Sequence, residues 1–425
     1  MKKLLCVALC LVLMCGLFAG CKKEEAPVTL QVGYAKVDIS PSFKVPMTGY
    51  GDENRYSEGI QDQIYTTCTA LRDSTGNTVL IFHNDLCTSA ADPIFHARKD
   101  IEKELGIPRD NIMVCSTHTH HSVDLNGSEG SVAKYKKQLR DWMVEAAKAA
   151  IADLKAAKMH VASVETEGIN FTRHYVMKDG SVAGDNFGDK SSGYKDYVRK
   201  ADPTMQFIKF TREGAKDVLL VNFATHPHRA GGTKDIYNKI TSDIVGIMRQ
   251  NVEEQLGCNF AYFTGAAGDV NPSSKFADDN AAKDYIQQGK IMADYAKQVY
   301  NSFTEVPVGK LQVVKNIHDA TPKEGVMDAS DIIQYAINVG EVAFVFAPYE
   351  MFNENGEQIM EGSPFKMTFV CSLSNEHVRY IPSTAGYEYD GLLSYGANAG
   401  RYAKGTGDTL AAKYVEMLKG LYGTK

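Results

Sequence analysis

Residues 78–115 read TVLIFHNDLCTSAADPIFHARKDIEKELGIPRDNIMVC and place three different patterns next to one another. Thr78–Phe82 and Ile112–Cys115 are short apolar runs of the length of a buried strand. Ala91–Leu105 between them has a helical pattern and stops at Gly106, with a proline two residues further on, which is typical of a helix exit. Strand, helix and strand in this order indicate α/β architecture.

The same alternation continues on both sides of this segment. Apolar and β-branched runs predict further strands at residues 30–39, 217–223, 260–264, 310–317 and 342–346. Helical patterns predict helices at residues 131–158, 243–256 (with Ser242 as N-cap), 280–303 and after 409. No linker rich in Pro, Gly or Ser divides the chain after residue 28. We therefore expect residues 29–425 to form one domain of mixed β-sheets flanked by helices.

Composition excludes several classes of protein. The chain has 425 residues, 44% of them hydrophobic, and a formal net charge of −6, so it is of ordinary globular composition and an unfavourable partner for nucleic acid. After the N-terminal segment the cysteines are scattered, without a CxxC pair: Cys68, Cys87, Cys115, Cys258 and Cys371. This spacing predicts neither a disulfide framework nor a cysteine zinc site. Nothing in the sequence sets the oligomeric state.

The N-terminus has the pattern of an export signal. Two lysines precede the apolar run Leu4–Phe18, and Leu17–Cys21 places small residues directly before a cysteine, which resembles a lipoprotein box. About 15 apolar residues fall short of the ~20 that a membrane-spanning helix needs. We expect residues 1–20 to be a signal peptide, Cys21 to be lipidated, and residues 21–28 to be a solvated tether. The protein would then be an exported bacterial lipoprotein, lipid-anchored to the cell-envelope membrane.

Three polar clusters directly follow predicted strands. They are Ser116–Ser122 (STHTHHS), Thr225–His228 (THPH) and Gly268–Asn271 (GDVN). In open α/β sheets, ligands gather outside the carboxyl ends of the strands. Because all three clusters follow strands, we expect them to contribute to one site.

The two histidine clusters have the residue types of a zinc site. In extended backbone His118 and His120 point to one face and His121 to the other. Neutral imidazole binds zinc at about 2.0–2.1 Å, and a catalytic site keeps about three protein ligands and a position for water. A single histidine after a strand is more often a hydrogen-bonded structural residue, but two clusters at separate strand ends favour a metal. Spacing alone does not identify the remaining ligands.

Five parts of the chain, in the same order, resemble the neutral (non-lysosomal) ceramidase family. They are its opening (Gly33–Pro41 with Met47–Gly51), its THTH motif (Ser116–His120), its second histidine motif (Phe223–Pro227), its GDVSP loop (Gly268–Pro272) and its late tyrosine motif (Asn375–Ile381). The resemblance spans roughly residues 31–410. It implies the fold of the catalytic domain of that family, here in a bacterial lipoprotein.

The resemblance also implies one catalytic zinc ion held by two histidines, a glutamate and a tyrosine. Carried over residue by residue, these ligands are His118, His226, Glu350 and Tyr380. Glu350 follows a predicted strand in the segment APYE, where the alternative is a carboxylate favoured by a helix N-terminus. The alternative for Tyr380 is an ordinary core tyrosine.

Further residues are assigned roles by the same resemblance. His120 matches a second family histidine, a proton carrier or oxyanion partner, and Arg173 matches an arginine that holds a product carboxylate, with a surface arginine as the alternative. Asp85 and Asp269 are expected to anchor histidine ring nitrogens. Asn271 replaces the serine of the GDVSP motif, which is held to be catalytic in ceramidases. An amide cannot act as a nucleophile, but it can donate a hydrogen bond to an oxyanion.

The implied activity is zinc-dependent hydrolysis of an amide (N-acyl) bond, less readily of an ester, by metal-activated water. The partner would be a small N-acyl compound, either a lipid or a compound that is not a lipid. Asn271 and the end of the chain at Lys425, which leaves no room for the C-terminal β-sandwich of full-length ceramidases, argue against ceramide. One alternative is a hydrolase of another N-acyl compound, such as an acylated amino sugar or amino acid. Another is a tethered solute- or metal-binding lipoprotein in which the altered site only binds.

Overall fold

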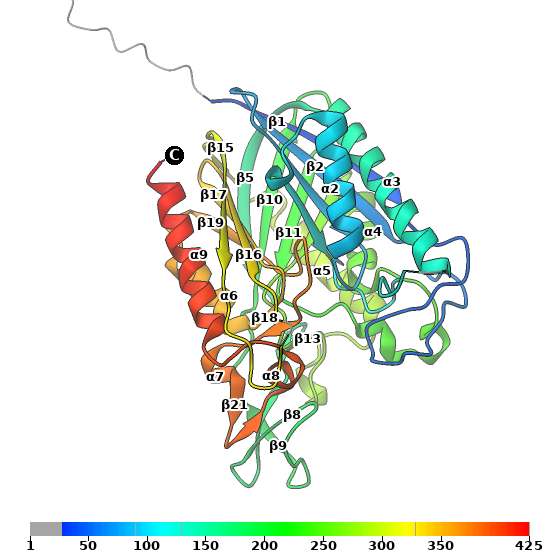
Figure 1. Ribbon diagram of the computed structural model, residues 1–425, viewed down its shortest axis with the longest axis vertical. Helices are drawn as coiled ribbons and strands as arrows, with labels where there is room; N and C mark the ends of the chain where they lie inside the picture. Colours follow the sequence, from blue (N-terminus) through cyan, green and yellow to red (C-terminus); the bar gives the residue numbers. More distant parts are fainter. Residues whose placement is uncertain (1–27, 90, 129, 328, 425) are drawn as a thin grey trace, which may run out of the picture.

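The computed structural model describes residues 28–89, 91–128, 130–327 and 329–424. The predicted signal peptide, Cys21 and nearly all of the predicted tether lie outside these residues. The described chain is built in four layers: helices, a large sheet, a small sheet and helices again (Figure 1).

The large sheet has nine strands in the order β12-β11-β10-β5-β1-β2-β3-β4, with β14 paired to β5. The β3–β4 and β11–β12 pairs are parallel and the others are antiparallel. The strands are β1 (Leu30–Asp38), β2 (Tyr65–Asp73), β3 (Thr78–Asn84), β4 (Ile112–Ser116), β5 (Lys155–Glu165), β10 (Thr204–Arg212), β11 (Val218–Phe223), β12 (Asn259–Thr264) and β14 (Thr304–Val306).

The small sheet covers one face of the large one. Its order is β15 (Leu311–His318), β16 (Ile332–Val339), β17 (Val342–Phe346) and β19 (Met367–Cys371), with only β17–β19 parallel. Successive side chains of a strand point to opposite faces. Val342 and Phe344 accordingly join the core between the sheets, whereas Ala343 and Val345 join the core under the outer helices. Strands buried on both faces explain the uninterrupted apolar runs in the sequence.

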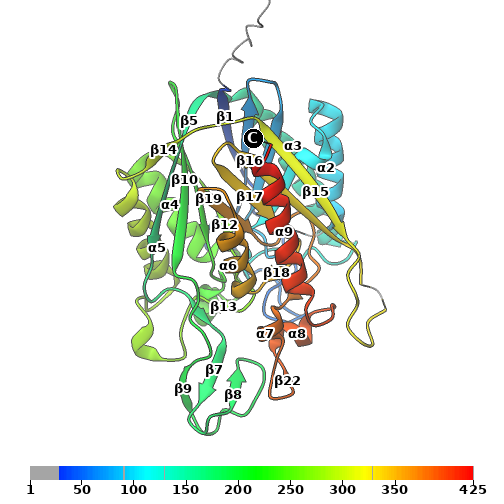
Figure 2. The same cartoon turned by 90° about the vertical axis from the view of Figure 1, so that its left-hand side faces the viewer.

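Helices cover both outer faces (Figures 1 and 2). The large sheet is covered by α2 (Ala91–Leu105), α3 (Gly130–Ala152), α4 (Asp243–Leu256) and α5 (Tyr285–Val299), and the small sheet by α6 (Asn353–Gly362) and α9 (Thr406–Tyr422). Within the described ranges none of the helices combines the length and apolar character needed to cross a bilayer.

Short helices and strands connect the elements of the layers. The helices are α7 (Thr384–Tyr387), α8 (Tyr395–Ala399) and 3₁₀ turns at Arg109–Asn111, Arg229–Gly232, Lys234–Ile236 and Ala277–Asp279. The strands are β6 (Phe171–Thr172), β7 (His174–Met177), β8 (Val182–Gly184), β9 (Tyr194–Tyr197), β13 (Val270–Asn271), β18 (Glu350–Met351), β20 (Tyr380–Ile381), β21 (Glu388–Tyr389) and β22 (Leu392–Leu393).

The expected α/β class with mixed sheets flanked by helices is confirmed, but two predicted helices are too long. The one predicted at 280–303 is observed at Tyr285–Val299, and the other extends into a strand. The helix predicted at residues 131–158 ends at Ala152, and Lys155–Glu165 forms β5. Alanine and lysine in this segment favour a helix locally. Its pairing with β10 and β1 buries Met159 and Val161 in the core between the sheets, and this tertiary gain outweighs the local preference.

The carboxyl ends of the two edge strands of the large sheet meet. Thr264 at the end of β12 donates its hydroxyl to the carbonyl of Thr117, just beyond β4, at 2.8 Å. The chain that leaves β19 joins them, because the amide of Ser372 donates to Thr264 at 3.0 Å. Three strand ends from two sheets therefore meet at one place, which the polar clusters occupy.

Candidate functional site

His118 leaves β4 in an unusual backbone conformation. Its φ is 69°, in the left-handed region that is uncommon for residues other than glycine. Its amide donates to the carbonyl of Leu86 at 2.9 Å, and its ring Nδ1 donates to the carbonyl of Cys87 at 2.6 Å. The backbone is thus not extended at His118, contrary to our expectation, because the chain turns to meet the loop after β3.

The three histidines of this cluster nevertheless point to the predicted sides, His118 and His120 to one and His121 to the other. The Nε2 atoms of His118 and His120 lie 3.3 Å apart. His121 turns to the other side, where its Nε2 lies 3.1 Å from the hydroxyl of Tyr50. His118 and His120 therefore face one site and His121 supports its wall.

His226 enters the same site from the end of β11. Its Nδ1 donates to the carbonyl of Val270 at 3.0 Å. Both His118 and His226 thus use Nδ1 on a backbone carbonyl, which fixes the tautomer and leaves Nε2 with its lone pair. This arrangement is the one that orients histidines for a metal ion.

Glu350 reaches the two histidines from β18, which follows β17 of the small sheet. Its Oε2 lies 3.3 Å from Nε2 of both His118 and His226. Strand β18 pairs in parallel with β20, so that Glu350 lies beside Tyr380 in register. The structure therefore brings together all four residues that the resemblance named as ligands.

His377 is a member of this cluster that the sequence analysis missed. Its Nε2 lies 3.3 Å from Oε1 of Glu350. The signal was present, since His377 lies inside the late tyrosine motif, but its spacing to other histidines carries no information.

The charges of the cluster are coupled. Burial opposes the ionisation of Glu350, but His118, His226 and His377 outweigh burial and hold the pKa of Glu350 well below its ordinary value. Burial similarly opposes a charge on His118, and Glu350 raises the pKa of His118 well above its ordinary value. Burial, followed by the charge of Glu350, raises the pKa of the Tyr380 phenol.

The donor atoms of this cluster suit a metal ion. Nε2 of His226 and Oε2 of Glu350 are buried and make no hydrogen bond with any group that the structure describes. One ligand atom each from His118, His226 and Glu350 lies within 4.8 Å of the others. Two imidazole nitrogens and a carboxylate oxygen are a donor set that zinc accepts. Cys87, His118 and His120 satisfy the same distance criterion, so that His118 belongs to both groups.

His120 is held as a neutral base on the pocket wall. Burial, and then the charges of His118 and His228, lower its pKa well below the ordinary value of histidine. Its ring packs on Gly49, where an added Cβ would lie 2.5 Å from Cβ of His120. Gly49 also has a φ of 120°, which explains the glycine in the segment MTGYG.

Arg173 and Asn271 form a second polar group beside the histidines. Arg173 donates from Nη2 to Oδ1 of Asn271 at 3.2 Å, and Nε2 of His228 lies 3.3 Å from the same oxygen. The amide nitrogen of Asn271 donates to Asp185 at 2.6 Å. Sequence analysis assigned no role to His228, although it lies in the THPH cluster, or to Asp185, for which no local signal exists.

Arg173 is buried but only partly paired. Its Nε and Nη1 atoms make no hydrogen bond within the described ranges, and its guanidinium lies over the ring of Tyr395 at 4.8 Å. The predicted alternative of a surface arginine does not hold, because the residue is only 8% exposed.

A pocket of about 400 Å³ opens onto these residues. Its wall includes His118, His120, Arg173, Glu350 and Tyr380. Asn271 and His226 are not on the wall but lie behind it. Asn271 would therefore act on a bound molecule through Arg173 and His228.

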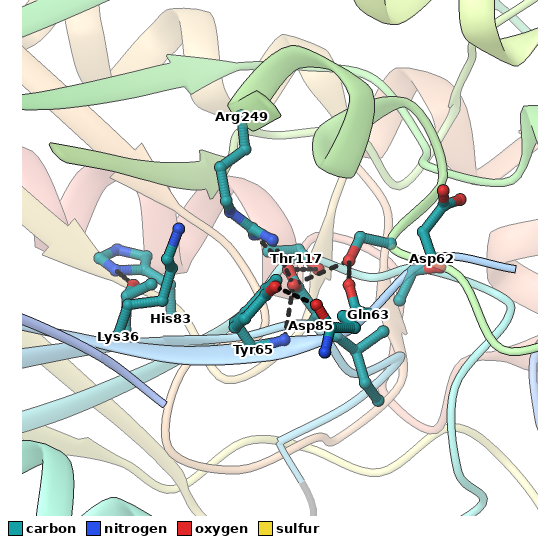
Figure 3. A network of polar contacts seen from close by, with 12 residues as sticks. Lys36, Asp62, Gln63, Tyr65, His83, Asp85, Thr117 and Arg249 are labelled. Atoms are coloured by element: carbon teal, nitrogen blue, oxygen red, sulfur yellow. Dashed lines mark hydrogen bonds and ion pairs between the residues drawn. The ribbon is translucent and has the colours of Figure 1, made fainter. Parts of the chain in front are cut away.

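The predicted roles of Asp85 and Asp269 are wrong. Asp85 forms a bidentate ion pair with Arg249 (Figure 3), with both N–O distances at 2.7 Å. It also accepts from the hydroxyl of Ser242 at 2.9 Å. Asp269 accepts from the amide of Asn353 at 2.7 Å. Neither carboxylate binds a histidine, because backbone carbonyls already accept the Nδ1 protons of the metal-facing histidines. Ser242 precedes α4 without capping it.

One protein family and two solved structures are similar to this chain. The family described as neutral/alkaline non-lysosomal ceramidase, N-terminal, matches residues 30–310. The crystal structure of the neutral ceramidase from Pseudomonas aeruginosa is similar, with a TM-score of 0.75 and 15% identity over 93% of this chain and 75% of that one. A structure of a ceramidase complexed with C2 has the same TM-score and identity, over 93% of this chain and 76% of that one. No curated protein matches the chain by sequence. At 15% identity, these likenesses establish the fold.

Proposed function

The chain belongs to the neutral/alkaline non-lysosomal ceramidase family, and we propose that it is a zinc-dependent hydrolase that cleaves the amide bond of an N-acyl compound. One observation carries this proposal: His118, His226 and Glu350 direct buried ligand atoms at one point beside the pocket, two of them without a hydrogen-bond partner among the described residues. Unpaired buried polar atoms are costly, so their presence together requires an explanation.

Zinc would be held by His118, His226 and Glu350, with Tyr380 as the fourth ligand. A zinc ion bound there supplies an activated water and a Lewis acid for the carbonyl oxygen. The carbonyls of Cys87 and Val270 keep both imidazoles in the tautomer that this requires.

The reaction adds water to the acyl carbon and breaks the C–N bond, so that a carboxylic acid and an amine leave. His120 is neutral at pH 7 because burial depresses its pKa. It can therefore accept the proton that water loses and pass it to the departing nitrogen. The N–H groups of Arg173 that make no hydrogen bond to a described residue are donors for an oxygen of the acyl group, and Asn271 positions Arg173 for this contact.

The test is turnover by protein stripped of metal and then reloaded. We expect the chelated protein to be inactive on short N-acyl amides and zinc to restore activity at one equivalent. Undiminished turnover after verified removal of metal would contradict the zinc assignment.

A second candidate is a tethered solute- or metal-binding protein, favoured by Asn271 in the place of the family serine. Metal content and turnover separate the two. One bound zinc per chain with no hydrolysis of any N-acyl compound tested would support binding alone.

We also propose that Cys21 carries a lipid that anchors the protein to the cell envelope. Cys21→Ser should abolish incorporation of labelled lipid and move the protein out of the membrane fraction. Equal labelling of the variant and the wild type would exclude this anchor.

A further inference from the structure

Nearly all the residues that line the pocket carry a polar side-chain group. Of its fifteen residues four are histidines, and the others include Arg173, Glu350, Asn186 and Cys87 with two glycines. The remaining five carry hydroxyl groups: Thr48, Tyr50, Thr88, Tyr380 and Tyr395. Within the described ranges no alanine, valine, leucine, isoleucine, methionine or phenylalanine contributes to this wall.

The apolar residues of the protein lie elsewhere. The described aliphatic side chains are concentrated between the two sheets and under the helices. None of the large apolar side chains that are exposed on the described surface lines the pocket; the aliphatic ones are Ile60, Ile286, Ile317, Met327 and Leu392. Neither the wall nor these side chains provide an apolar channel that leads away from the histidines.

A long acyl chain gains affinity only from apolar walls. Each methylene buried from water strengthens binding by about fourfold, whereas a polar wall gives up its own hydration to cover the chain. Hydroxyls, imidazoles and a guanidinium instead match a substrate that makes hydrogen bonds. A pocket of about 400 Å³ is also near the lower end of the range for small-molecule sites.

We propose that the substrate is a water-soluble N-acyl compound with a short acyl group and a polar amine, rather than a long-chain N-acyl lipid. The amine would carry hydroxyl or carboxyl groups, as in an N-acetylated amino alcohol, amino acid or amino sugar. This inference rests on the proposed amide hydrolysis, because it names the substrate class of the same site.

The test is a series of N-acylserinols with acyl groups of two, four, six and eight carbons, hydrolysed by the zinc-loaded full chain below the concentration at which they form micelles. A single amine keeps the polar half constant. We expect kcat/KM to be highest for the acetyl compound and to stay level or fall along the series. A rise towards the fourfold per methylene expected of an apolar wall would overturn the proposal and leave amide hydrolysis standing.

The outcome can be separated from failure of the proposed function. N-acetylated amino acids and amino sugars are tested in parallel, and hydrolysis of these with none of the serinols would support the proposal with a different amine. No hydrolysis of any compound by zinc-loaded protein would overturn amide hydrolysis itself, and this inference with it.

A variant tests the wall directly. Thr48→Val with Thr88→Val replaces two wall hydroxyls by methyl groups at similar volume. We expect the ratio of kcat/KM for the hexanoyl over the acetyl compound to rise at least threefold. Thr409→Val, on the exposed face of α9, is the matched control and should leave the ratio unchanged. An unchanged ratio in the correctly folded double variant would show that these residues do not meet the acyl group, and would overturn the proposal.

Discussion

Two buried carboxylates, Asp85 and Glu350, lie near the carboxyl ends of strands, but only one has all its hydrogen bonds. Asp85 follows β3 and accepts from both terminal nitrogens of Arg249 and from the amide of Tyr65 (Figure 3), and also from Ser242. Glu350 follows β17, its carboxylate lies beside Tyr380 and 3.3 Å from the imidazoles of His118, His226 and His377, and its Oε2 makes no hydrogen bond to a described residue.

Asp85 therefore stabilises the fold, whereas Glu350 has the unused acceptor capacity of a ligand-binding group. Asp85 ties α4 to the end of β3, beside the loop on which His118 rests, and its charge is compensated within the protein. Glu350 and His226 are instead buried with unmet bonding capacity, which costs stability. A costly arrangement of nitrogen and oxygen atoms around one point is what a preformed metal site requires.

The largest effect is expected from breaking the ion pair between Asp85 and Arg249. Arg249→Met leaves Asp85 buried without its counter-charge and should lower the free energy of unfolding by about 3–5 kcal/mol. Urea denaturation measures this loss. Asp85→Asn added to Arg249→Met removes the stranded charge and should restore much of the lost stability. If the double variant is less stable than Arg249→Met, the charge of Asp85 is compensated by other groups.

A substitution in the cluster of His118, His226 and Glu350 should weaken zinc binding without destabilising the fold. His226→Ala should weaken zinc affinity by more than 10²-fold, since loss of a supporting contact alone costs 10–100-fold. The circular dichroism should be nearly unchanged. Titration with a competing chelator measures the affinity. His121→Ala is the control, because His121 is buried nearby but faces Tyr50, and it should keep its zinc. Equal affinity in both variants would remove His226 from the site.

Asn271 sharpens the comparison, because it belongs to the site although both polar atoms of its side chain already have partners within the protein. Asn271→Ala frees Arg173 and His228 and should lower kcat by about 10²-fold with zinc still bound. Asn271→Ser should be no faster than the wild type in steady-state hydrolysis of short N-acyl substrates. An inert wild type beside an active serine variant would overturn hydrolysis by activated water and favour a binding protein.

His83, on the side of the Asp85 network, provides the smallest effect. Burial, followed by the charge of Arg249, lowers its pKa to about 3. A depressed pKa stabilises the folded state above the unfolded value of 6.5, and this stability is lost as the pH falls from 6.5 towards 3.

Between pH 7 and pH 5, protonation of His83 in the unfolded state should lower the unfolding free energy of the wild type by about 2 kcal/mol. His83→Phe should not show this loss. Urea denaturation of both proteins at the two pH values measures the difference. An identical pH dependence would show that His83 is not buried in its neutral form.

Local patterns in the sequence were sufficient for much of the fold. The apolar runs and the helix exit at Gly106 placed β3, α2 and β4 within two residues of their observed bounds. The apolar pattern of these three segments reflects which of their own faces are buried, and neighbouring residues in the sequence encode that pattern. The same reasoning failed at Lys155–Glu165, where composition favours a helix and pairing with β1 and β10 decides for a strand.

By itself the sequence determined the strand–helix–strand order of residues 78–116, the histidine clusters after β4 and β11, and the motifs that resemble a family. Only the tertiary structure decided that Glu350 meets those histidines, that His377 contacts Glu350, that Asp185 holds Asn271, and that Asp85 pairs with Arg249. The physical reason is distance along the chain. Apart from His377, which lies 27 positions from Glu350, these partners are more than 80 positions apart and come together through packing of the sheets, so neither their spacing nor their type encodes the contact locally.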